Sequence, residues 1–483
     1  MNLKEIIQVI DPEQIYGNTD IEIADIVYDS RKASDNSLFI CIEGFENDGH
    51  DYINNAVNNG TVAVLIEKDL NEYRNDITYV KVNDSRKKMS KMAALFYGYP
   101  LRKLQLIGIT GTNGKTTTSY LIKSIIENAG FKTGLIGTIN IIIGEERLPA
   151  TRTTPESLDL YKYFSRMVKK GVTHVVMEVS SHALELERVK GMDFTIAVFT
   201  NISQDHLDFH NSLEAYLKAK SKLFQQVKEN GYGIINIDDD KSDYIIKNTR
   251  GNVLTYSIEN KSDIQARKIK LDIKGVHFKT DYIKNINIKL TGRFNVYNAL
   301  AGITTGKALG LSKDNIKTGL EEMEGVPGRF ELIDENQNFG VIVDYAHTPD
   351  GMENVLQTAR EITNNNIIIV FGCGGDRDKG KRPLMGKIGI KYGDYCILTS
   401  DNPRSEDPID ILKQIEAGIN SQNKDLYEVI PDRKKAIFRA IEIAQKDDFV
   451  IIIGKGHETY QIFKNKTIHF DDREVAREAI SCL

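Results

Sequence analysis

The chain has 483 residues, of which 41% are hydrophobic and 27% charged, and a formal net charge of −5 at pH 7. This length exceeds what one hydrophobic core usually serves, so we expect about three domains of ordinary globular composition. The negative charge argues against a protein that binds nucleic acid mainly by neutralising phosphates.

Cysteine usage and the start of the chain predict where the protein works. Cys41, Cys373, Cys396 and Cys482 are far apart and lack metal-ligand spacing, and so sparse a set suits a reducing compartment. The opening residues MNLKEIIQVIDPEQ lack the basic-then-apolar pattern of a signal peptide. Because no apolar run approaches the roughly 18 residues of a bilayer span, we expect a cytoplasmic protein without a membrane span.

The first block of the chain, residues 1–101, predicts a small α/β domain. Its short apolar runs at 38–42 and 62–66 are typical of buried strands, with a helix-like segment between them. Gly98 and Pro100 mark a break at the end of the block.

The second block, residues 102–329, begins with an apolar strand at 104–110, a glycine-rich turn and a helix. Apolar side chains from Leu121 to Ala129 recur on one face of that helix, and Gly130 ends it. Further strands are predicted at 173–179, 195–200 and 231–237. Strands that alternate with helices indicate a mostly parallel, doubly wound sheet.

The third block, residues 330–483, predicts a second doubly wound sheet of Rossmann-like type. Each apolar run in it is followed by glycine or polar residues and then a helix. In such sheets ligands bind beyond the carboxyl ends of the strands, where the motifs described next are found. The strand-like runs are 341–343, 367–371, 395–399 and 449–453.

The strongest motif is GTNGKTT at 111–117, between a strand and a helix. Its glycines let backbone N–H groups curl around phosphate oxygens, while Lys115 would reach the β- and γ-phosphates and the Thr116 hydroxyl would ligate Mg²⁺. Gly108 stands six residues before Gly114, so the spacing is a variant one, and the alternative is a plain strand–helix turn. The predicted ATP contacts are Gly111, Thr112, Asn113, Gly114, Lys115, Thr116 and Thr117.

Two polar residues follow the next predicted strands. Glu178 ends one apolar run and His206 follows the next, and a carboxylate at such an edge can hold a hard cation. Alone, each is more often a capping or solvated residue. Together, after a phosphate loop, they favour a metal–phosphate site.

Nine strings then carry a resemblance. The strings are, in chain order, GTNGKTT, MEVSSH, TNISQDH, GRFNVYN, GVPGRFE, VDYAHTPDG, GDRDKGKRP, DNPR and GKGHE. Together with a matching segment in the N-terminal block, the resemblance runs from near residue 29 to about residue 472. The chain therefore resembles the Mur ligases of peptidoglycan synthesis, and among them those that add the third amino acid to UDP-N-acetylmuramoyl-L-Ala-D-Glu. The resemblance implies a UDP-binding domain at 1–101, a central P-loop ATPase at 102–329 and an amino-acid-binding domain at 330–483.

The implied reaction is ATP-dependent amide formation. ATP phosphorylates the terminal carboxylate of the acceptor, an amine attacks the acyl phosphate, and phosphate leaves. The resemblance assigns catalytic roles to Lys115, Glu178, His206 and Lys220, and a metal site for Mg²⁺ to Thr116, Glu178, His206 and Lys220. Lys220 would act as a carbamate, formed when CO₂ adds to its neutral amine, although the residues alone would suggest a solvated helix face.

The remaining implied contacts depend mainly on the resemblance. Asn295 could equally be a helix N-cap, and many relatives carry glutamine where this chain has Leu186. Further nucleotide contacts are Asn295, Arg329, Asp344 and His347. The acceptor contacts are Ser30, Phe45, Glu46, Asn47, Thr153, Thr154, Ser180 and Arg188.

The amino acid is expected to be meso-diaminopimelate, whose distal carboxylate needs a cation. The predicted contacts for it are Arg377, Asp401, Asn402, Pro403, Arg404, Gly454 and Glu458. Arg404 would supply the cation, unless it only caps a turn by pairing with Glu406 or Asp407. Alternatives are the same ligation with L-lysine, a folylpolyglutamate-synthetase-like ligase, or an ATP-driven switch module. We expect a monomer whose partners are UDP-N-acetylmuramoyl-L-Ala-D-Glu, ATP and meso-diaminopimelate.

Overall fold

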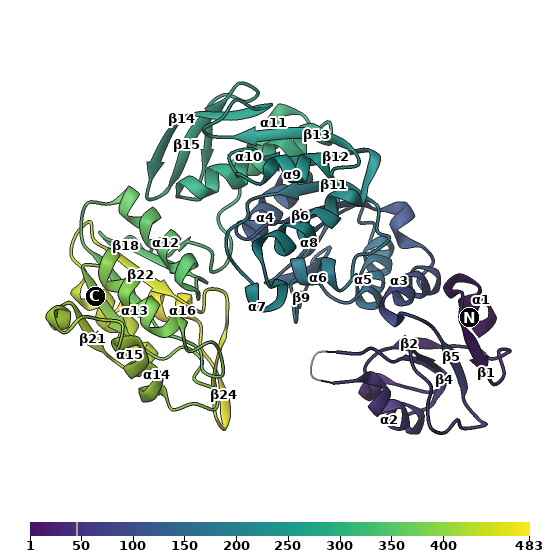
Figure 1. Ribbon diagram of the computed structural model, residues 1–483. Coiled ribbons are helices and arrows are strands. Elements are labelled where there is room, and N and C mark those ends of the chain that lie inside the picture. Colours follow the sequence, from purple (N-terminus) through teal and green to yellow (C-terminus); the bar gives the residue numbers. More distant parts are fainter. Residues whose placement is uncertain (45–46) are drawn as a thin grey trace. The chain divides into compact units, whose positions relative to one another are not determined.

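The computed structural model describes residues 1–44 and 47–483 (Figure 1). These form two compact units, Met1–Asp263 with Ala301–Ile316, and Ile264–Leu300 with Lys317–Leu483. Both units mix helices with largely parallel sheets, as predicted. Among the described residues, no helix is both long and apolar enough to cross a bilayer.

The beginning of the first unit forms a small sheet in the order β1-β5-β4-β3-β2, parallel except for β1. Alternate strand residues face opposite sides: Phe39 and Val64 pack with α2, whereas Leu38 and Leu65 share a core with α1 and α3. The strands are β1 Gln14–Tyr16, β2 Asp25–Val27, β3 Ser37–Ile40, β4 Thr61–Ile66 and β5 Thr78–Lys81. The helices are α1 Leu3–Ile10, η1 Ser30–Lys32, η2 Gly49–Tyr52, α2 Ile53–Asn58, α3 Ser85–Phe96 and η3 Pro100–Lys103.

The rest of the first unit is built on a sheet in the order β13-β12-β11-β6-β10-β7-β8-β9. It is parallel from β13 to β7, and β8 and β9 continue it antiparallel. The strands are β6 Gln105–Thr110, β7 Thr133–Ile136, β8 Asn140–Ile143, β9 Glu146–Pro149, β10 His174–Glu178, β11 Phe194–Phe199, β12 Val227–Asn236 and β13 Asn252–Ser257. The helices are α4 Lys115–Asn128, α5 Ser157–Lys169, α6 Ser181–Glu185, α7 Leu207–His210, α8 Leu213–Gln225 and α9 Ser242–Lys247.

The register of the three central strands positions the predicted site. β6 lies between β10 and β11, with Glu178 opposite Ile109 and Phe199 opposite Thr110. All three strands run in the same direction, so their carboxyl ends meet at one edge. The phosphate loop, Glu178 and the segment after Phe199 therefore leave the sheet side by side.

The second unit opens with an antiparallel meander that the sequence did not predict. Its strands are β14 Ile264–Asp272, β15 Gly275–Thr280 and β16 Ile286–Ile288. Charged residues on β14, including Arg267 and Lys270, hide the apolar alternation that would mark a strand. The helices α10 Arg293–Ala308 and α11 Lys313–Glu321 follow in sequence, and their residues between 301 and 316 belong to the first unit.

That last sheet has the order β17-β18-β22-β19-β20-β21 and is parallel except for β17. Ile342 and Ile369 pack with α12–α14 on one face, and Val341 and Val370 pack with α15 and α16 on the other, so the sheet is doubly wound as predicted. The strands are β17 Glu331–Leu332, β18 Gly340–Asp344, β19 Ile367–Phe371, β20 Tyr395–Leu398, β21 Tyr427–Val429 and β22 Phe449–Ile453. The helices are α12 Pro349–Ile362, α13 Lys381–Tyr392, α14 Pro408–Glu416, η4 Ser421–Leu426, α15 Arg433–Ile443 and α16 Asp472–Ser481.

One predicted connection is wrong. A hairpin, β23 Tyr460–Phe463 with β24 Lys466–His469, separates β22 from α16, where a helix was expected directly after the strand. The glycines Gly454 and Gly456 both have positive φ angles, and they turn the chain into this hairpin in place of a helix.

Candidate functional site

The phosphate loop lies between β6 and α4 and is tied to the segment that follows β11. The Asn113 N–H donates to Asn201 Oδ1 at 2.9 Å, and the Thr112 N–H donates to the Asn201 carbonyl at 2.9 Å. Gly111 has a φ of +152°, and a Cβ there would stand 1.8 Å from Thr200 Oγ1. The loop can approach this segment so closely only because residue 111 has no side chain. With Gly114 at the N-cap of α4, its backbone is arranged as in an anion-binding loop.

Two lysines meet at one carbonyl of this loop. Lys115 Nζ donates to Gly111 O at 2.9 Å and to Thr112 O at 2.8 Å, and Lys220 Nζ, from α8, donates to Gly111 O at 2.8 Å. Lys220 is 1% exposed and lies 4.2 Å from the ring centroid of Tyr216. Burial, together with the charge of Lys115, lowers the pKa of Lys220 well below its usual value. The alternative of a solvated helix face is therefore wrong for Lys220, and its environment favours the neutral amine that carbamate formation requires.

Glu178 and Thr116 form the second part of this site. Glu178 is fully buried, and its carboxylate accepts hydrogen bonds from Thr116 Oγ1 at 2.9 Å, Thr138 Oγ1 at 2.9 Å and the Thr138 N–H at 2.8 Å. Carboxylate and hydroxyl oxygens are the donors that Mg²⁺ prefers. In the described part of the chain, no group of three or more histidine, cysteine and acidic side chains is arranged to hold a metal. A metal here would therefore also need oxygens from the nucleotide or from a carbamate.

His206 lies beside the Lys220 side of the site. Its ring centroid is 6.1 Å from that of Tyr216, which also contacts Lys220, and 4.7 Å from that of His182. The backbone of His206 has a φ of +53°, which is uncommon for residues other than glycine. Such conformations persist where the surroundings impose them and cluster at functional sites.

The predicted acceptor residues of β10 and its neighbours form one hydrogen-bonded group. Thr154 Oγ1 donates to the Glu178 carbonyl at 2.9 Å and accepts from the Ser180 N–H at 3.0 Å, while Arg188 Nη1 donates to the Thr154 carbonyl at 3.1 Å. Thr153 Oγ1 lies 3.1 Å from Thr138 Oγ1, beside the Glu178 carboxylate. This group therefore connects directly to the part of the site formed by Glu178 and Thr116.

The sequence analysis missed Glu156 as part of this group. This carboxylate is 4% exposed and pairs with three guanidinium groups, those of Arg86, Arg152 and Arg188, at 3.1, 2.8 and 2.9 Å. Three positive charges around one negative charge leave a local positive excess, which favours an anionic ligand. The sequence offers one signal for Glu156, its position directly after the Thr-Thr-Pro segment at 153–155. Arg86 is 70 residues away in the sequence and gives no signal.

The remaining acceptor residues lie near the small sheet. Ser30 is 7% exposed, begins η1, and its carbonyl accepts from Asn59 Nδ2 at 3.0 Å. Asn47 is exposed and accepts from the Tyr52 hydroxyl at 3.1 Å. Phe45 and Glu46 lie outside the described residues. The assignment of this segment to UDP binding stays a prediction.

The nucleotide contacts expected in the second unit form a second group. Asp344 ends β18 and accepts from the N–H groups of Phe330 and Ala346, each at 2.7 Å, and burial raises its pKa. The Arg329 guanidinium lies 4.8 Å from the ring centroid of Tyr345, whose carbonyl is 3.0 Å from His347 Nδ1. Tyr345, which the sequence analysis missed, therefore contacts two members of this group, Arg329 and His347.

Asn295 is buried in the first turn of α10 and donates through Nδ2 to the Thr291 carbonyl at 2.8 Å. The helix begins at Arg293, two residues earlier, so the alternative that Asn295 is its N-cap is wrong. Its predicted role as an adenine contact stays a prediction.

The amino-acid residues predicted in the last sheet come together after β20 and β22. Asn402 accepts from the Ile462 N–H at 2.9 Å and donates to Glu458 Oε2 at 2.9 Å, and Lys455 Nζ lies 3.0 Å from the same oxygen. Gly454, with a φ of +122°, approaches Asp401 so closely that a Cβ would stand 2.7 Å from Asp401 Oδ2. Lys455, fully buried, is a member of this group that the sequence analysis missed.

The guanidinium groups of the two arginines predicted for this site are held by different hydrogen bonds. Arg404 Nη1 donates to the carbonyls of Gly375 at 2.8 Å and Asn402 at 3.5 Å. The alternative that Arg404 pairs with Glu406 or Asp407 is wrong, because no ion pair between described residues joins it to either acid, and the Glu406 carboxylate is engaged by Arg382. Arg377 is exposed, and its Nη1 donates to the carbonyl of its neighbour Asp376 at 3.4 Å.

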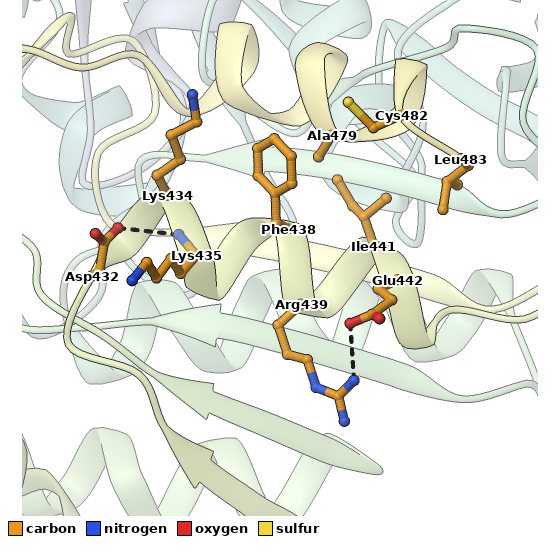
Figure 2. Close-up of a pocket in the computed structure, with 10 residues that line it drawn as sticks. All are labelled: Asp432, Lys434, Lys435, Phe438, Arg439, Ile441, Glu442, Ala479, Cys482 and Leu483. Atoms are coloured by element: carbon orange, nitrogen blue, oxygen red, sulfur yellow. Dashed lines mark hydrogen bonds and ion pairs between the residues drawn. The ribbon is translucent and has the colours of Figure 1, made fainter.

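A cavity of about 530 Å³ lies against α15 and α16, away from these residues (Figure 2). Phe438 and Ile441 form its apolar wall, and an Arg439–Glu442 ion pair lies at its edge. None of the predicted site residues lines it.

Comparisons with known proteins agree with the order of the motifs. Three family models match the chain: "Mur ligase family, catalytic domain" at residues 22–97, "Mur ligase middle domain" at 109–306 and "Mur ligase, glutamate ligase domain" at 328–456. A protein from Caldanaerobacter subterraneus subsp. tengcongensis, named UDP-N-acetylmuramoyl-L-alanyl-D-glutamate–2,6-diaminopimelate ligase, is 50% identical over 100% of this chain and 99% of its own.

Two further relatives bear the same name. One from Clostridium tetani is 48% identical over 99% of both chains. A solved structure with this name is 33% identical, with a TM-score of 0.71 over 100% of this chain and 99% of its own. The similarity therefore extends along the whole chain.

Proposed function

This chain belongs to the Mur ligase family of ATP-dependent, amide-bond-forming enzymes, and we propose that it adds meso-2,6-diaminopimelate to UDP-N-acetylmuramoyl-L-Ala-D-Glu. Relatives named for this activity, 50% and 48% identical over nearly their full length, support the proposal. The observation that carries the chemistry is the meeting of Lys115 and Lys220 at the Gly111 carbonyl, in the same loop whose Thr116 contacts Glu178.

The proposed reaction has two steps. In the first, a carboxylate oxygen of the acceptor attacks the γ-phosphorus of ATP, the bond to the bridging oxygen breaks, and ADP and an acyl phosphate form. In the second, an amine of the amino acid attacks the acyl carbon, and the tetrahedral intermediate expels phosphate as the amine loses a proton. The products are one amide, ADP and phosphate.

Each part of the first site has a proposed role. The loop N–H groups and Lys115 bind the phosphates, with Lys115 moving from the carbonyls of its own loop to the transferring oxygens. Thr116, Glu178, His206 and the Lys220 carbamate would hold Mg²⁺, which when bound offsets the repulsion between two anions. Arg188, Thr153, Thr154 and Ser180 would orient the acceptor peptide, since an arginine fork pairs well with a carboxylate.

The residues that come together after β20 and β22 would bind the amino acid. Arg404, which donates to backbone carbonyls, would bind the distal carboxylate of diaminopimelate, and Glu458 and Asp401 would meet ammonium groups. L-lysine lacks that carboxylate, so it is the competing substrate. We further propose domains at 1–101, 102–329 and 330–483, and a monomer that works in the cytoplasm.

A phosphate-release assay with ATP, the acceptor and a panel of amino acids tests the proposal. We expect release only when both acceptor and diaminopimelate are present, with a product heavier by one diaminopimelate residue. Equal turnover with L-lysine would replace the proposed amino acid. Release without acceptor would indicate an ATP-driven switch, and turnover with a folate acceptor would indicate the folylpolyglutamate-type reaction.

A further inference from the structure

Two loops of the second unit lie against each other beyond the ends of β19 and β20. We call residues 374–377 the first loop and residues 401–406 the second loop. We propose that Arg382 and Glu406 form a positioning pair that fixes these two loops, and through them Arg404, for the distal carboxylate of the incoming amino acid. This inference rests on the proposed function and deepens it.

The pair is partly buried, with the Glu406 side chain 17% exposed, and it is geometrically specific. Arg382 is 0% exposed, and its two terminal nitrogens donate to the two oxygens of Glu406, each at 2.9 Å. Nη1 also donates to Gln414 Oε1 at 2.9 Å, and Nη2 to the Gly374 carbonyl at 3.3 Å. A bidentate arginine–carboxylate pair fixes orientation as well as distance. Arg382, at the start of α13, therefore anchors both loops to the same helix.

The two loops are also bonded to each other in both directions. Glu406 Oε1, from the second loop, accepts from the Asp376 N–H of the first loop at 2.6 Å. The Asp376 carboxylate in turn accepts from the Ser405 N–H at 3.2 Å and from Ser405 Oγ at 2.6 Å. Glu406 therefore connects Arg382 to the hydrogen bonds that join Asp376 and Ser405.

Each loop has one non-glycine residue whose backbone φ angle is positive, which is a strained conformation. Asp376 has a φ of +54° and Arg404 a φ of +51°, and neither is a glycine. Such conformations persist only where surrounding contacts impose them, and they cluster at ligand sites. The close approach is tight as well, since a Cβ on Gly375 would stand 1.9 Å from the Pro403 carbonyl. The reciprocal bonds around Glu406 are the contacts that can hold these two residues in place.

The consequence for Arg404 follows from its hydrogen bonds. Its backbone N–H donates to the Ile462 carbonyl at 3.0 Å, and its guanidinium donates to the Gly375 carbonyl at 2.8 Å. The Arg404 side chain, from the second loop, is therefore held by the backbone of the first loop. If the loops separate, the guanidinium loses its support. Arg382 also keeps Glu406 engaged, which prevents that acid from neutralising Arg404 in place of the substrate carboxylate.

Glu406→Gln tests the pair, because glutamine has the same shape and can still accept from the Asp376 N–H but loses the charge. We expect the preference for diaminopimelate over L-lysine, measured as a ratio of kcat/KM, to fall about tenfold through a higher KM for diaminopimelate. KM values for ATP and the acceptor should not change. Glu406→Asp, which keeps the charge, should recover part of the preference.

Glu478→Gln is the matched control. Glu478 forms an exposed ion pair with Lys434 at 2.7 Å in the same unit, and we expect no change in the ratio. If Glu406→Gln does not fold, Arg382→Lys replaces it, since lysine keeps the charge but not the two-pronged geometry. A folded variant whose activity falls equally with both amino acids, or not at all, would overturn the inference. Wild-type enzyme that uses both amino acids equally would instead refute the proposed function.

Discussion

The phosphate-loop region of the first unit and the two-loop region of the second unit both hold cations that we propose bind anionic ligands, but they restrain them differently. Lys115 and Lys220 donate to backbone carbonyls of one loop, and Glu178 accepts from hydroxyls and an N–H. Around Arg404, by contrast, a partly buried ion pair and reciprocal bonds fix two strained loops.

This difference in restraint matches the task that we propose for each region. Bonds from lysine to carbonyl oxygen can be exchanged for bonds to phosphate as charge moves during phosphoryl transfer. A selective site has the opposite need, because a preference for one amino acid depends on a cation that keeps its place. We therefore expect substitutions in the first region to abolish chemistry and substitutions in the second to change selection.

Lys115→Ala should have the largest effect. Removing the only loop lysine takes away the charge that bridges transferring and leaving oxygens, so turnover should fall about a thousandfold or more while the fold remains. Steady-state phosphate release and thermal unfolding, measured on the same preparation, check this. Near-normal release by the variant would show that the loop is not the ATP site.

Lys220→Ala should come next, with a loss of about a hundredfold. Short carboxylates added in excess should restore part of the activity, because they can supply the missing anionic oxygen. Lys218→Ala and Lys222→Ala, on the same helix, are the controls and should stay active. ¹³C NMR with labelled CO₂ should detect a carbamate in wild type that is absent from the variant, and full activity of Lys220→Ala would contradict the role.

Arg404→Ala should change selection more than rate. Loss of a charged hydrogen bond of about 1.5–3 kcal/mol corresponds to about a ten- to hundredfold smaller preference for diaminopimelate over L-lysine. Activity with lysine should be nearly unchanged. Values of kcat/KM for both amino acids give the result, and the same ratio in wild type and variant would exclude Arg404 as the selective residue.

Arg86→Ala should have a smaller effect, on the acceptor alone. Its guanidinium is one of three around Glu156, and its removal should reduce the local positive excess and raise the KM for the acceptor about fivefold, on the scale of a partly buried ion pair. Arg250→Ala, which breaks an exposed pair with Glu229, is the control. A changed KM for ATP with an unchanged one for the acceptor would contradict this placement.

The smallest expected effect is that of pH on selection. The Arg382 guanidinium holds the pKa of Glu406 at about 2, below its ordinary 4.5. A carboxyl with a lowered pKa contributes fully above its unfolded value and loses the contribution only as pH falls toward the folded one. The diaminopimelate preference should therefore be flat between about pH 6 and 8. A several-fold change of the ratio across that range would show that another group controls Arg404.

Sequence reasoning succeeded where a local pattern carries the structure. The run 367–371 is apolar throughout because β19 is buried on both faces, and glycines at 111 and 114 mark the loop between β6 and α4. It failed where partners are distant: Glu156 meets Arg86 and Glu406 meets Arg382 only after folding. The solvent-facing charges of β14 concealed that strand for a similar reason, since exposed positions say little about structure.

The most direct test of the central claim uses acceptor labelled with ¹⁸O in its terminal carboxylate, together with ATP and diaminopimelate. An acyl phosphate passes one carboxylate oxygen to phosphate when the amine displaces it. We predict that the released phosphate carries one ¹⁸O and that the acceptor gains one diaminopimelate residue. Unlabelled phosphate, or labelled phosphate with lysine incorporated as readily as diaminopimelate, would contradict the account.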